Sequence, residues 1–178
     1  MKTNIALIGF MGTGKTAVGQ LLAEKLSRKF IELDWSIEEQ AGKTIPEIFR
    51  DDGEIAFREL EIEATRKIAG ENYCVIACGG GLVLNKINTD RLRESGKTVY
   101  LTASPGIILK RTTADGGTRP LLMVDDPAGT IRSMLKARKS IYEQTADITI
   151  DTSKLDTEAV AEQIIRTLGE DESFDLQK

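Results

Sequence analysis

The part of the sequence best suited to chemistry is residues 9–16, which read GFMGTGKT and match the phosphate-binding pattern G-x-x-x-x-G-K-[ST] at all four specified positions. The pattern follows a predicted strand and opens a predicted helix, where glycines let backbone N–H groups converge on phosphate oxygens. In such a loop Lys15 reaches the β- and γ-phosphates and the Thr16 hydroxyl binds Mg²⁺. The segment therefore predicts a nucleoside triphosphate site, with a chance glycine-rich turn as the alternative.

Two carboxylates, Glu32 and Asp34, stand at the end of the second apolar run. If residues 30–34 are extended, period-two alternation places both on one side, with Cα atoms about 6.5 Å apart. The carboxyl end of a parallel strand is where α/β sheets bind ligands. One carboxylate could then accept a hydroxyl proton while the other holds metal-bound water. A solvated loop start is the alternative that the local sequence leaves open.

Two arginines and a glycine triplet could bind an acceptor substrate. Arg58 lies three residues before Glu61, and a surface ion pair between them is the interpretation that the local sequence favours. Arg138 falls within the apolar stripe of a helical pattern, so it either snorkels to solvent or faces an anion across a cleft. The glycines at 79–81 follow a predicted strand and would let a small molecule approach the backbone closely, although a flexible turn has the same composition.

The composition excludes several classes of function. The 178 residues include no histidine, which rules out a Ser-His-Asp or Cys-His nucleophile, histidine-ligated zinc and a histidine base. Cys74 and Cys78 are too few for a disulfide scaffold or a four-cysteine zinc site, so we expect reduced, buried thiols. A net charge of −4 without a basic run argues against a nucleic-acid partner. No segment has the roughly 18 apolar residues of a membrane span, so we expect a cytoplasmic enzyme with no membrane partner.

Short apolar runs alternate with helical patterns along the chain, which predicts βαβ units and a parallel sheet covered on both faces. Strands are expected at residues 5–8, 30–33, 73–77, 98–101 and 148–150. We expect a single domain over residues 1–178, with a helical substrate-binding insertion over about 34–70. Residues 112–127 are rich in turn formers and suit a mobile lid, and the polar residues 170–178 are expected to be a frayed tail.

Several of these elements together resemble the shikimate kinase family over about residues 4–168. They are the phosphate loop, Asp34, the Phe-Arg-x-x-Glu of residues 57–61, the glycine triplet and the Arg-Pro-Leu-Leu of residues 119–122. The resemblance implies a P-loop kinase fold of the nucleoside-monophosphate-kinase type, an α/β/α sandwich with a five-stranded parallel sheet. It also implies ATP and Mg²⁺ as cofactors, phosphorylation of the 3-hydroxyl of shikimate on the way to chorismate and the aromatic amino acids, and a monomer.

The resemblance assigns a role to each candidate residue. ATP would be held by Gly12, Thr13, Gly14, Lys15, Thr16 and Ala17, with Thr16 also on the metal. Asp34 would orient or deprotonate the attacking hydroxyl, and Lys15 and Arg119 would complete the catalytic set, with Arg119 moving in with the lid to stabilise charge on the transferring phosphoryl group. Shikimate would be bound by Asp34, by Arg58 and Arg138 on its carboxylate, and by the backbone of Gly79, Gly80 and Gly81.

Two residues depart from the family's usual pattern. Glu32 stands where Asp is usual, and Cys78 precedes the glycine triplet where Thr or Ser is frequent. Both substitutions lie beside the expected metal site, and the loop at residues 152–156 lacks the Arg and Pro often found on the adenine side. The alternatives are therefore a kinase for another small metabolite, such as gluconate, and an inactive ligand-sensing module. Retention of Lys15, Asp34 and Arg119 argues against the inactive module.

Overall fold

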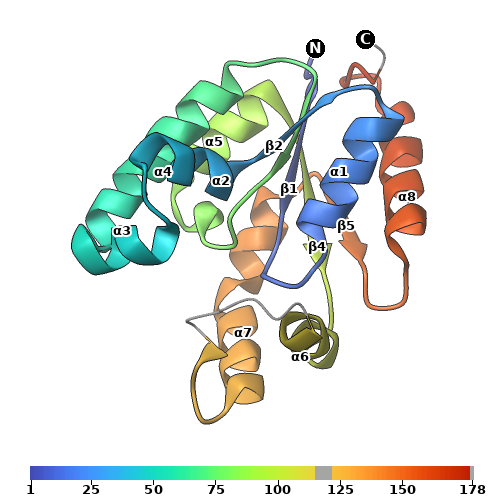
Figure 1. Cartoon of the computed structure of the whole chain (residues 1–178). Helices are drawn as coiled ribbons and strands as arrows, with labels where there is room; N and C mark the ends of the chain where they lie inside the picture. The colour runs from blue at the N-terminus through green and yellow to red at the C-terminus, as the bar shows by residue number, and fades with distance from the viewer. Residues whose placement is uncertain (115–121, 177–178) are drawn as a thin grey trace.

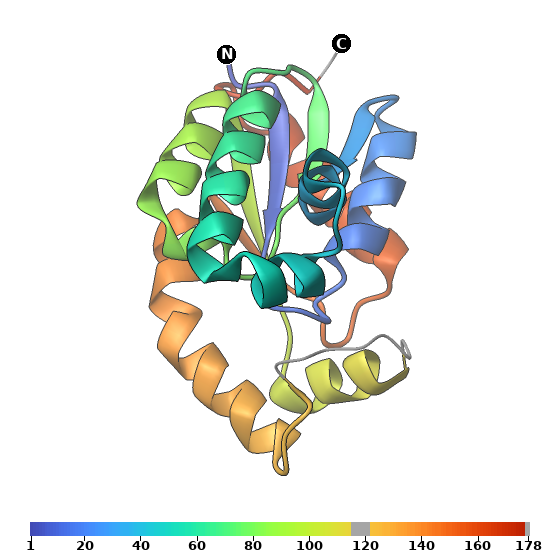
Figure 2. The ribbon, with the colours of Figure 1, turned by 60° about the vertical axis from the view of Figure 1, so that its left-hand side comes forward.

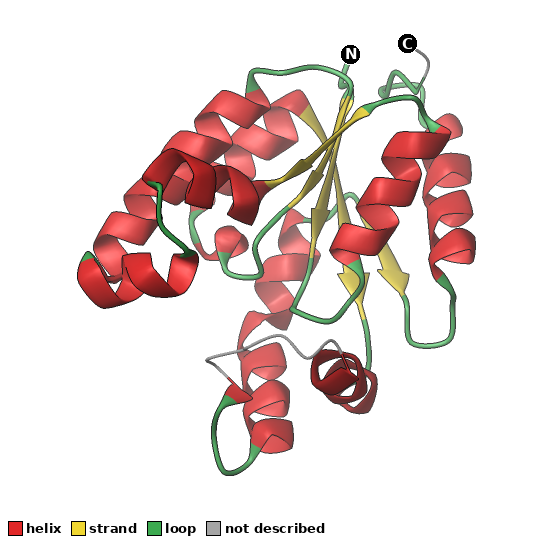
Figure 3. Cartoon of the chain, in the orientation of Figure 1, coloured by secondary structure: helices red, strands yellow, loops and turns green. Residues whose placement is uncertain are grey.

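The computed structural model describes residues 1–114 and 122–176 of the chain. Its strands form one parallel sheet of five, in the order β2-β3-β1-β4-β5. The strands are β1 (Asn4–Ile8), β2 (Lys29–Glu32), β3 (Cys74–Ala77), β4 (Gly96–Thr102) and β5 (Ile148–Asp151). The predicted five-stranded parallel sheet is confirmed, and Figure 3 shows the strands running toward one end of the molecule, opposite the chain termini.

Helices cover both faces of the sheet and give the predicted α/β/α sandwich (Figure 1). They are α1 (Lys15–Lys25), α2 (Leu33–Ala41), α3 (Ile45–Asp51), α4 (Gly53–Ala69), η1 (Leu82–Leu84), α5 (Lys86–Ser95), α6 (Pro105–Ala114), α7 (Pro127–Thr145) and α8 (Thr157–Gly169). On one face α1 packs against α8, and on the other α4 packs against α5. Figure 2 shows α6 and the start of α7 extending past the end of the sheet.

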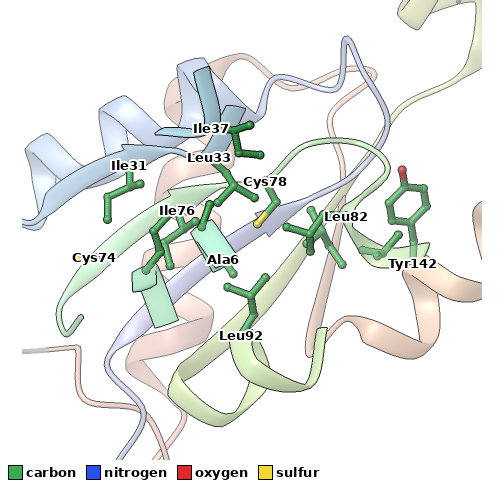
Figure 4. Packing of buried hydrophobic residues seen from close by; sticks show 14 of the residues in the cluster. Ala6, Ile31, Leu33, Ile37, Cys74, Ile76, Cys78, Leu82, Leu92 and Tyr142 are labelled. Atoms are coloured by element: carbon green, nitrogen blue, oxygen red, sulfur yellow. The ribbon is translucent and has the colours of Figure 1, made fainter. Parts of the chain in front are cut away.

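The central strand β1 shows how one short apolar run serves two cores. All of its residues are buried, as expected for a parallel strand covered on both faces. Ile5 and Leu7 belong to the cluster beneath α1 and α8, whereas Ala6 and Ile8 belong to the cluster beneath α2, α4 and α5. Because successive side chains point to opposite faces, the run Ile5–Ile8 fills both cores. Figure 4 shows the second cluster, with Tyr142 at its edge beyond Leu82.

The second strand ends earlier than predicted, and this changes the setting of Asp34. We expected a strand over residues 30–33, with Glu32 and Asp34 alternating on one side, but β2 ends at Glu32 and α2 begins at Leu33. Leu33 and Ile37 are both buried, and their i,i+4 spacing lets α2 bury an apolar stripe as soon as the strand ends. Asp34 therefore lies in the first turn of a helix, where the helix dipole favours a carboxylate.

The prediction of a frayed tail is wrong for residues 170–176. Phe174 is 5% exposed and packs, with Leu176, into the cluster beneath α1 and α8. The tail also pairs with the amino terminus, since Lys2 and Phe174 form a parallel bridge and the Asp175 N–H donates to the Lys2 carbonyl at 2.9 Å. The polar composition of this segment concealed two apolar side chains with the spacing that places both against the core.

The helical character expected of the insertion is observed, because α2, α3 and α4 fill residues 33–69. Of the lid expected over residues 112–127, the structure places 112–114 at the end of α6 and 122–126 before α7. Arg119 lies outside the described residues, as do Pro120 and Leu121. In the part of the chain that is described, no helix has the length and apolar character needed to cross a membrane.

Candidate active site

The phosphate loop joins β1 to α1, which is the strand–loop–helix setting that its sequence pattern requires. Gly9, Gly12 and Gly14 all have positive φ, at 146°, 74° and 97°. A Cβ at Gly9 would also clash with the carbonyl oxygen of Leu101. These positions need glycine for backbone reasons, so the loop can curl around a ligand at the amino end of α1.

The Lys15 side chain is held at the phosphate loop by backbone carbonyls of that loop. Its Nζ donates to the carbonyl oxygens of Gly9 at 2.8 Å and Phe10 at 2.9 Å. The Thr13 hydroxyl donates to the same Phe10 carbonyl at 2.8 Å and braces the turn. The ammonium is thereby held beside the amides that would receive phosphate oxygens, which suits a lysine that binds phosphate as a point charge.

Oxygen ligands meet at the start of α1. The Thr16 hydroxyl donates to Glu32 Oε2 at 2.8 Å, and Asp34 lies in the same cleft. Burial raises the pKa of Glu32 and the charge of Asp34 raises it further, whereas the Thr16 hydrogen bond lowers it. Among the described residues, no three or more Asp, Glu, Cys or His side chains lie close enough together to hold a metal ion by themselves. Mg²⁺ commonly takes only one or two carboxylates beside substrate phosphates, so the Thr16 and Glu32 oxygens fit it.

The acceptor side of the cleft is built around the glycine triplet that follows β3. A Cβ at Gly79 would lie 2.7 Å from Asp34 Oδ1, so glycine is needed for the carboxylate to come this close. At Gly81 a Cβ would lie 3.3 Å from the terminal nitrogens of Arg58. Asp34 and Arg58 therefore reach the triplet from α2 and α4, at positions two residues apart in the loop.

Arg58 is not part of an ordinary surface ion pair, which corrects the interpretation that the local sequence favoured. Its Nη1 lies 3.0 Å from Glu61 Oε2, and the Glu61 side chain is only 2% exposed. Burial raises the pKa of Glu61, and the charge of Arg58 opposes that rise. A half-buried guanidinium is thus held in place by a buried carboxylate, with Glu54 at 3.4 Å on its exposed side.

Arg138 is half-buried and reaches toward the glycine triplet. Its Nη1 donates to the Gly80 carbonyl at 3.5 Å, and its guanidinium carbon lies 6.0 Å from the centre of the Phe10 ring. It therefore approaches the glycine triplet from α7, while Arg58 approaches from α4. Two cations and one carboxylate surround a stretch of backbone that has no side chains.

A cleft of about 510 Å³ joins the phosphate loop to Asp34 and to the first two glycines of the triplet, and neither Arg58 nor Arg138 lines it. Of the predicted site residues it is lined by Gly12, Thr13, Gly14, Lys15, Thr16, Ala17, Asp34, Gly79 and Gly80. Arg58 and Gly81 instead line a separate hollow of about 300 Å³ that also includes Lys86. Cys78 lines the main cleft and is buried, as is Cys74, so the expected burial of both thiols is confirmed. Burial raises the pKa of the Cys78 thiol, which leaves it protonated and unreactive.

Sequence analysis missed Arg111, which lines the cleft from the last turn of α6. Its Nη1 donates to Thr152 Oγ1 at 2.9 Å and to the Gly12 carbonyl at 3.3 Å, and its Nη2 donates to the Thr152 carbonyl at 2.8 Å. It ties the phosphate loop to the segment after β5. No motif marks this position, since Arg111 is one of two adjacent basic residues in an amphipathic helix.

Comparison with known proteins gives a consistent result. The sequence model of the family "Shikimate kinase" matches residues 11–169. A shikimate kinase of Pelotomaculum thermopropionicum is 46% identical over 167 residues, covering 94% of this chain and 96% of the relative. The solved shikimate kinase of Acinetobacter baumannii in complex with shikimate superposes with a TM-score of 0.90 at 37% identity, covering 97% of this chain and 96% of that one.

For the alternative of a gluconate kinase, comparison with solved structures shows only a similar fold. A gluconokinase structure from Sinorhizobium meliloti has a TM-score of 0.56 at 20% identity, over 90% of this chain and 88% of that one. Identity this low shows a shared architecture and no more. The family match over most of the chain, together with relatives above 40% identity, shows that this protein belongs to the shikimate kinase family.

Proposed function

We propose that the protein transfers the terminal phosphoryl group of ATP to the 3-hydroxyl of shikimate, giving ADP and shikimate 3-phosphate, a step toward chorismate and the aromatic amino acids. The observation that carries this proposal is the meeting of a phosphate loop with Asp34, Arg58 and Arg138 around one glycine triplet. A related protein of 37% identity has been solved with shikimate bound. An acceptor that carries both hydroxyls and a carboxylate accounts for one acidic and two basic side chains.

Binding of ATP rests on the loop and on the residues that begin α1. Backbone amides of residues 12–17 receive phosphate oxygens at the amino end of the helix, and Lys15 adds a positive charge. Thr16 and Glu32 would hold Mg²⁺, which when bound neutralises charge on the β- and γ-phosphates. We propose that Arg111 contributes to the same half of the cleft, because its contacts join Gly12 to Thr152.

Asp34 acts on the acceptor. Its carboxylate accepts a hydrogen bond from the attacking hydroxyl, orients the oxygen toward the γ-phosphorus, and takes the proton as the new P–O bond forms. The bond from the γ-phosphorus to the bridging oxygen breaks at the same time, and ADP leaves with that electron pair. Phosphoryl transfer of this kind depends on positioning and charge stabilisation, so the absence of histidine is no obstacle.

The two arginines select the acceptor. Arg58 and Arg138 approach the triplet from different helices, so they can bind one carboxylate from two sides and set which hydroxyl faces Asp34. Gluconate also carries a carboxylate and hydroxyls but is an open-chain acid, so the choice between the two acceptors depends on where their hydroxyls lie relative to Asp34. We further propose that Arg119 stabilises charge on the transferring group, on the basis of the family resemblance.

The direct test is ADP formation in a coupled assay with Mg-ATP, with and without shikimate. We expect ADP formation that depends on shikimate and that gluconate at the same concentration does not support. ATP binding without shikimate-dependent turnover would reject the proposed reaction and favour the ligand-sensing alternative. In the same assay Arg119→Ala should lower kcat while leaving shikimate affinity in place.

We also propose that the enzyme works as a cytoplasmic monomer that binds neither nucleic acid nor membranes. Support comes from the net charge of −4 without a basic run and from the family resemblance. Light scattering at micromolar concentration should give the mass of one chain, and a mass of two chains would reject the monomer.

A further inference from the structure

Tyr142 joins α7 to the glycine triplet without lining the cleft. It is fully buried, and its hydroxyl donates to the Gly80 carbonyl at 2.5 Å. Its ring stacks on Tyr100, with ring centres 4.9 Å apart and planes 10° apart. Figure 4 shows the ring at the edge of the core, next to the loop that contains Leu82. A side chain held this firmly can set the orientation of the peptide that it contacts.

In the glycine triplet the three carbonyl oxygens have hydrogen-bond donors, whereas the three N–H groups have no acceptor among the described residues. All three carbonyls are engaged: Gly79 accepts from the Leu82 N–H and Gly81 from the Leu84 N–H, both at 3.1 Å, and Gly80 accepts from Tyr142. Across residues 1–114 and 122–176, none of the three N–H groups has an acceptor. The three glycines are half-exposed, and Gly79 and Gly80 line the main cleft, so these donors are open to a ligand that enters it.

We propose that Tyr142 is a positioning residue that keeps the Gly81 amide hydrogen available to the acceptor. In a planar trans peptide the C=O and N–H point in opposite directions, so holding the Gly80 carbonyl toward α7 turns the Gly81 N–H away from it. Glycine peptides rotate more easily than others, so an unheld triplet would sample other orientations. This inference rests on the proposed function, because the ligand in question is the hydroxylated acceptor of that reaction.

Tyr142 is better suited to this role than Arg138, which reaches the same carbonyl. The Arg138 contact is long, at 3.5 Å, and the proposed function assigns its guanidinium to the substrate carboxylate. Burial raises the pKa of Tyr142 to about 12 against the opposing effect of the neighbouring Arg138, which keeps the hydroxyl a donor at neutral pH. One turn of α7 therefore carries both a substrate-binding cation and the group that holds the loop beside it.

The test is Tyr142→Phe, which keeps the ring stack and removes the hydroxyl. Tyr100→Phe is the matched control, because it removes a hydroxyl from the same stack and no described hydrogen bond of that hydroxyl reaches the triplet. Trp35, the only tryptophan of the sequence, adjoins Asp34 and gives a fluorescence signal for titration with shikimate. We expect Tyr142→Phe to weaken shikimate binding about tenfold and to raise its KM similarly, as for a buried carbonyl that loses its donor. The KM for ATP should stay within about twofold in both variants.

A second measurement examines the loop without any substrate. The Gly81 amide shares a peptide unit with the Gly80 carbonyl, so its ¹⁵N chemical shift in the ligand-free protein reports whether that carbonyl is held. Tyr142→Phe should move this signal and Tyr100→Phe should not. Unchanged amide signals with unchanged shikimate affinity would overturn the inference. Failure of the wild-type protein to bind shikimate would reject the proposed function instead, and the amide signals would still decide what Tyr142 does.

Discussion

The two ends of the parallel sheet treat their backbone polar groups in opposite ways. At the carboxyl end, the triplet Gly79–Gly81 keeps three N–H groups without acceptors among the described residues. At the amino end, the buried guanidinium of Arg28 donates to the carbonyls of Thr3 at 2.6 Å, Asp175 at 2.8 Å and Leu176 at 2.9 Å. One end leaves backbone donors available to a ligand, whereas at the other a buried arginine satisfies the carbonyls of the amino terminus and of the tail.

The side chains at the two ends of the sheet also differ: those at the amino end pack against one another, whereas those at the cleft stand beside glycines. The rings of Tyr73 and Phe174 lie about Arg28, at 5.5 and 5.4 Å from its guanidinium carbon, and the Tyr73 hydroxyl donates to Asp175 at 2.8 Å. At the cleft, charged groups such as Asp34 stand beside glycines that supply no side chain at all. The tail also lies beyond residues 11–169, which are the part matched by the family model.

The largest effect is expected at the carboxyl end. Asp34→Asn removes the group that we propose orients and deprotonates the attacking hydroxyl, so turnover should fall by about 10²- to 10⁴-fold while ATP affinity is largely kept. The coupled ADP assay and an ATP titration measure the two quantities. Glu39→Gln, at an exposed position of the same helix, is the control. Undiminished turnover in Asp34→Asn would remove Asp34 from the mechanism.

At the amino end the loss should appear in stability instead. Phe174→Ala deletes a buried ring and should lower the free energy of unfolding by about 3 kcal/mol, by analogy with other buried Phe→Ala changes. Urea denaturation measures this loss, and kcat and both KM values should stay unchanged below the transition. A large loss of activity in the folded variant would show that the two ends are coupled and would break the comparison.

A smaller effect on the carboxyl end should come from Arg138→Ala. Loss of a charged partner for the shikimate carboxylate should raise the KM for shikimate about 10- to 100-fold, and the KM for ATP much less. Arg132→Ala, at an exposed position of α7, serves as the control in the same steady-state assay. If the KM for ATP rose instead, Arg138 would belong to the other substrate.

The smallest effect concerns the pH dependence of the stability that an ion pair of the tail contributes. Hydrogen bonds from Lys97 and Ser173 lower the pKa of Asp171 to about 2, below its usual value of 3.8. Because the folded-state value is the lower one, this stabilisation is present above about pH 4 and is lost as the pH falls toward 2. Asp171→Asn should therefore destabilise the protein at pH 7 more than at pH 3, by urea denaturation at both values. Glu172→Gln should show no such difference, and an equal loss at both pH values in Asp171→Asn would contradict the assignment.

Local patterns were sufficient for most of the fold and for half of the cleft. The glycine positions of the phosphate loop and the apolar run of β1 act through their immediate neighbours, so their structure could be predicted from spacing alone. The end of β2 could not, because Leu33 and Ile37 start a helix only when a core lies ready to receive them. The prediction for the tail failed for a similar reason, since Phe174 packs in a cluster that includes residues as distant in sequence as Ile5 and Leu7.

The sequence by itself determined the chemistry available to this protein: a phosphate loop, oxygen ligands, no histidine, and cations at positions that the shikimate kinase pattern names. Tertiary structure decided which of these groups meet. Arg58 and Arg138, 80 residues apart in sequence, reach one glycine triplet. Tyr142, one turn after Arg138 in α7, holds the Gly80 carbonyl of that triplet, and no motif marks its position. The physical reason is that hydrogen-bond partners and burial depend on distances in space, whereas local sequence patterns report only on neighbours along the chain.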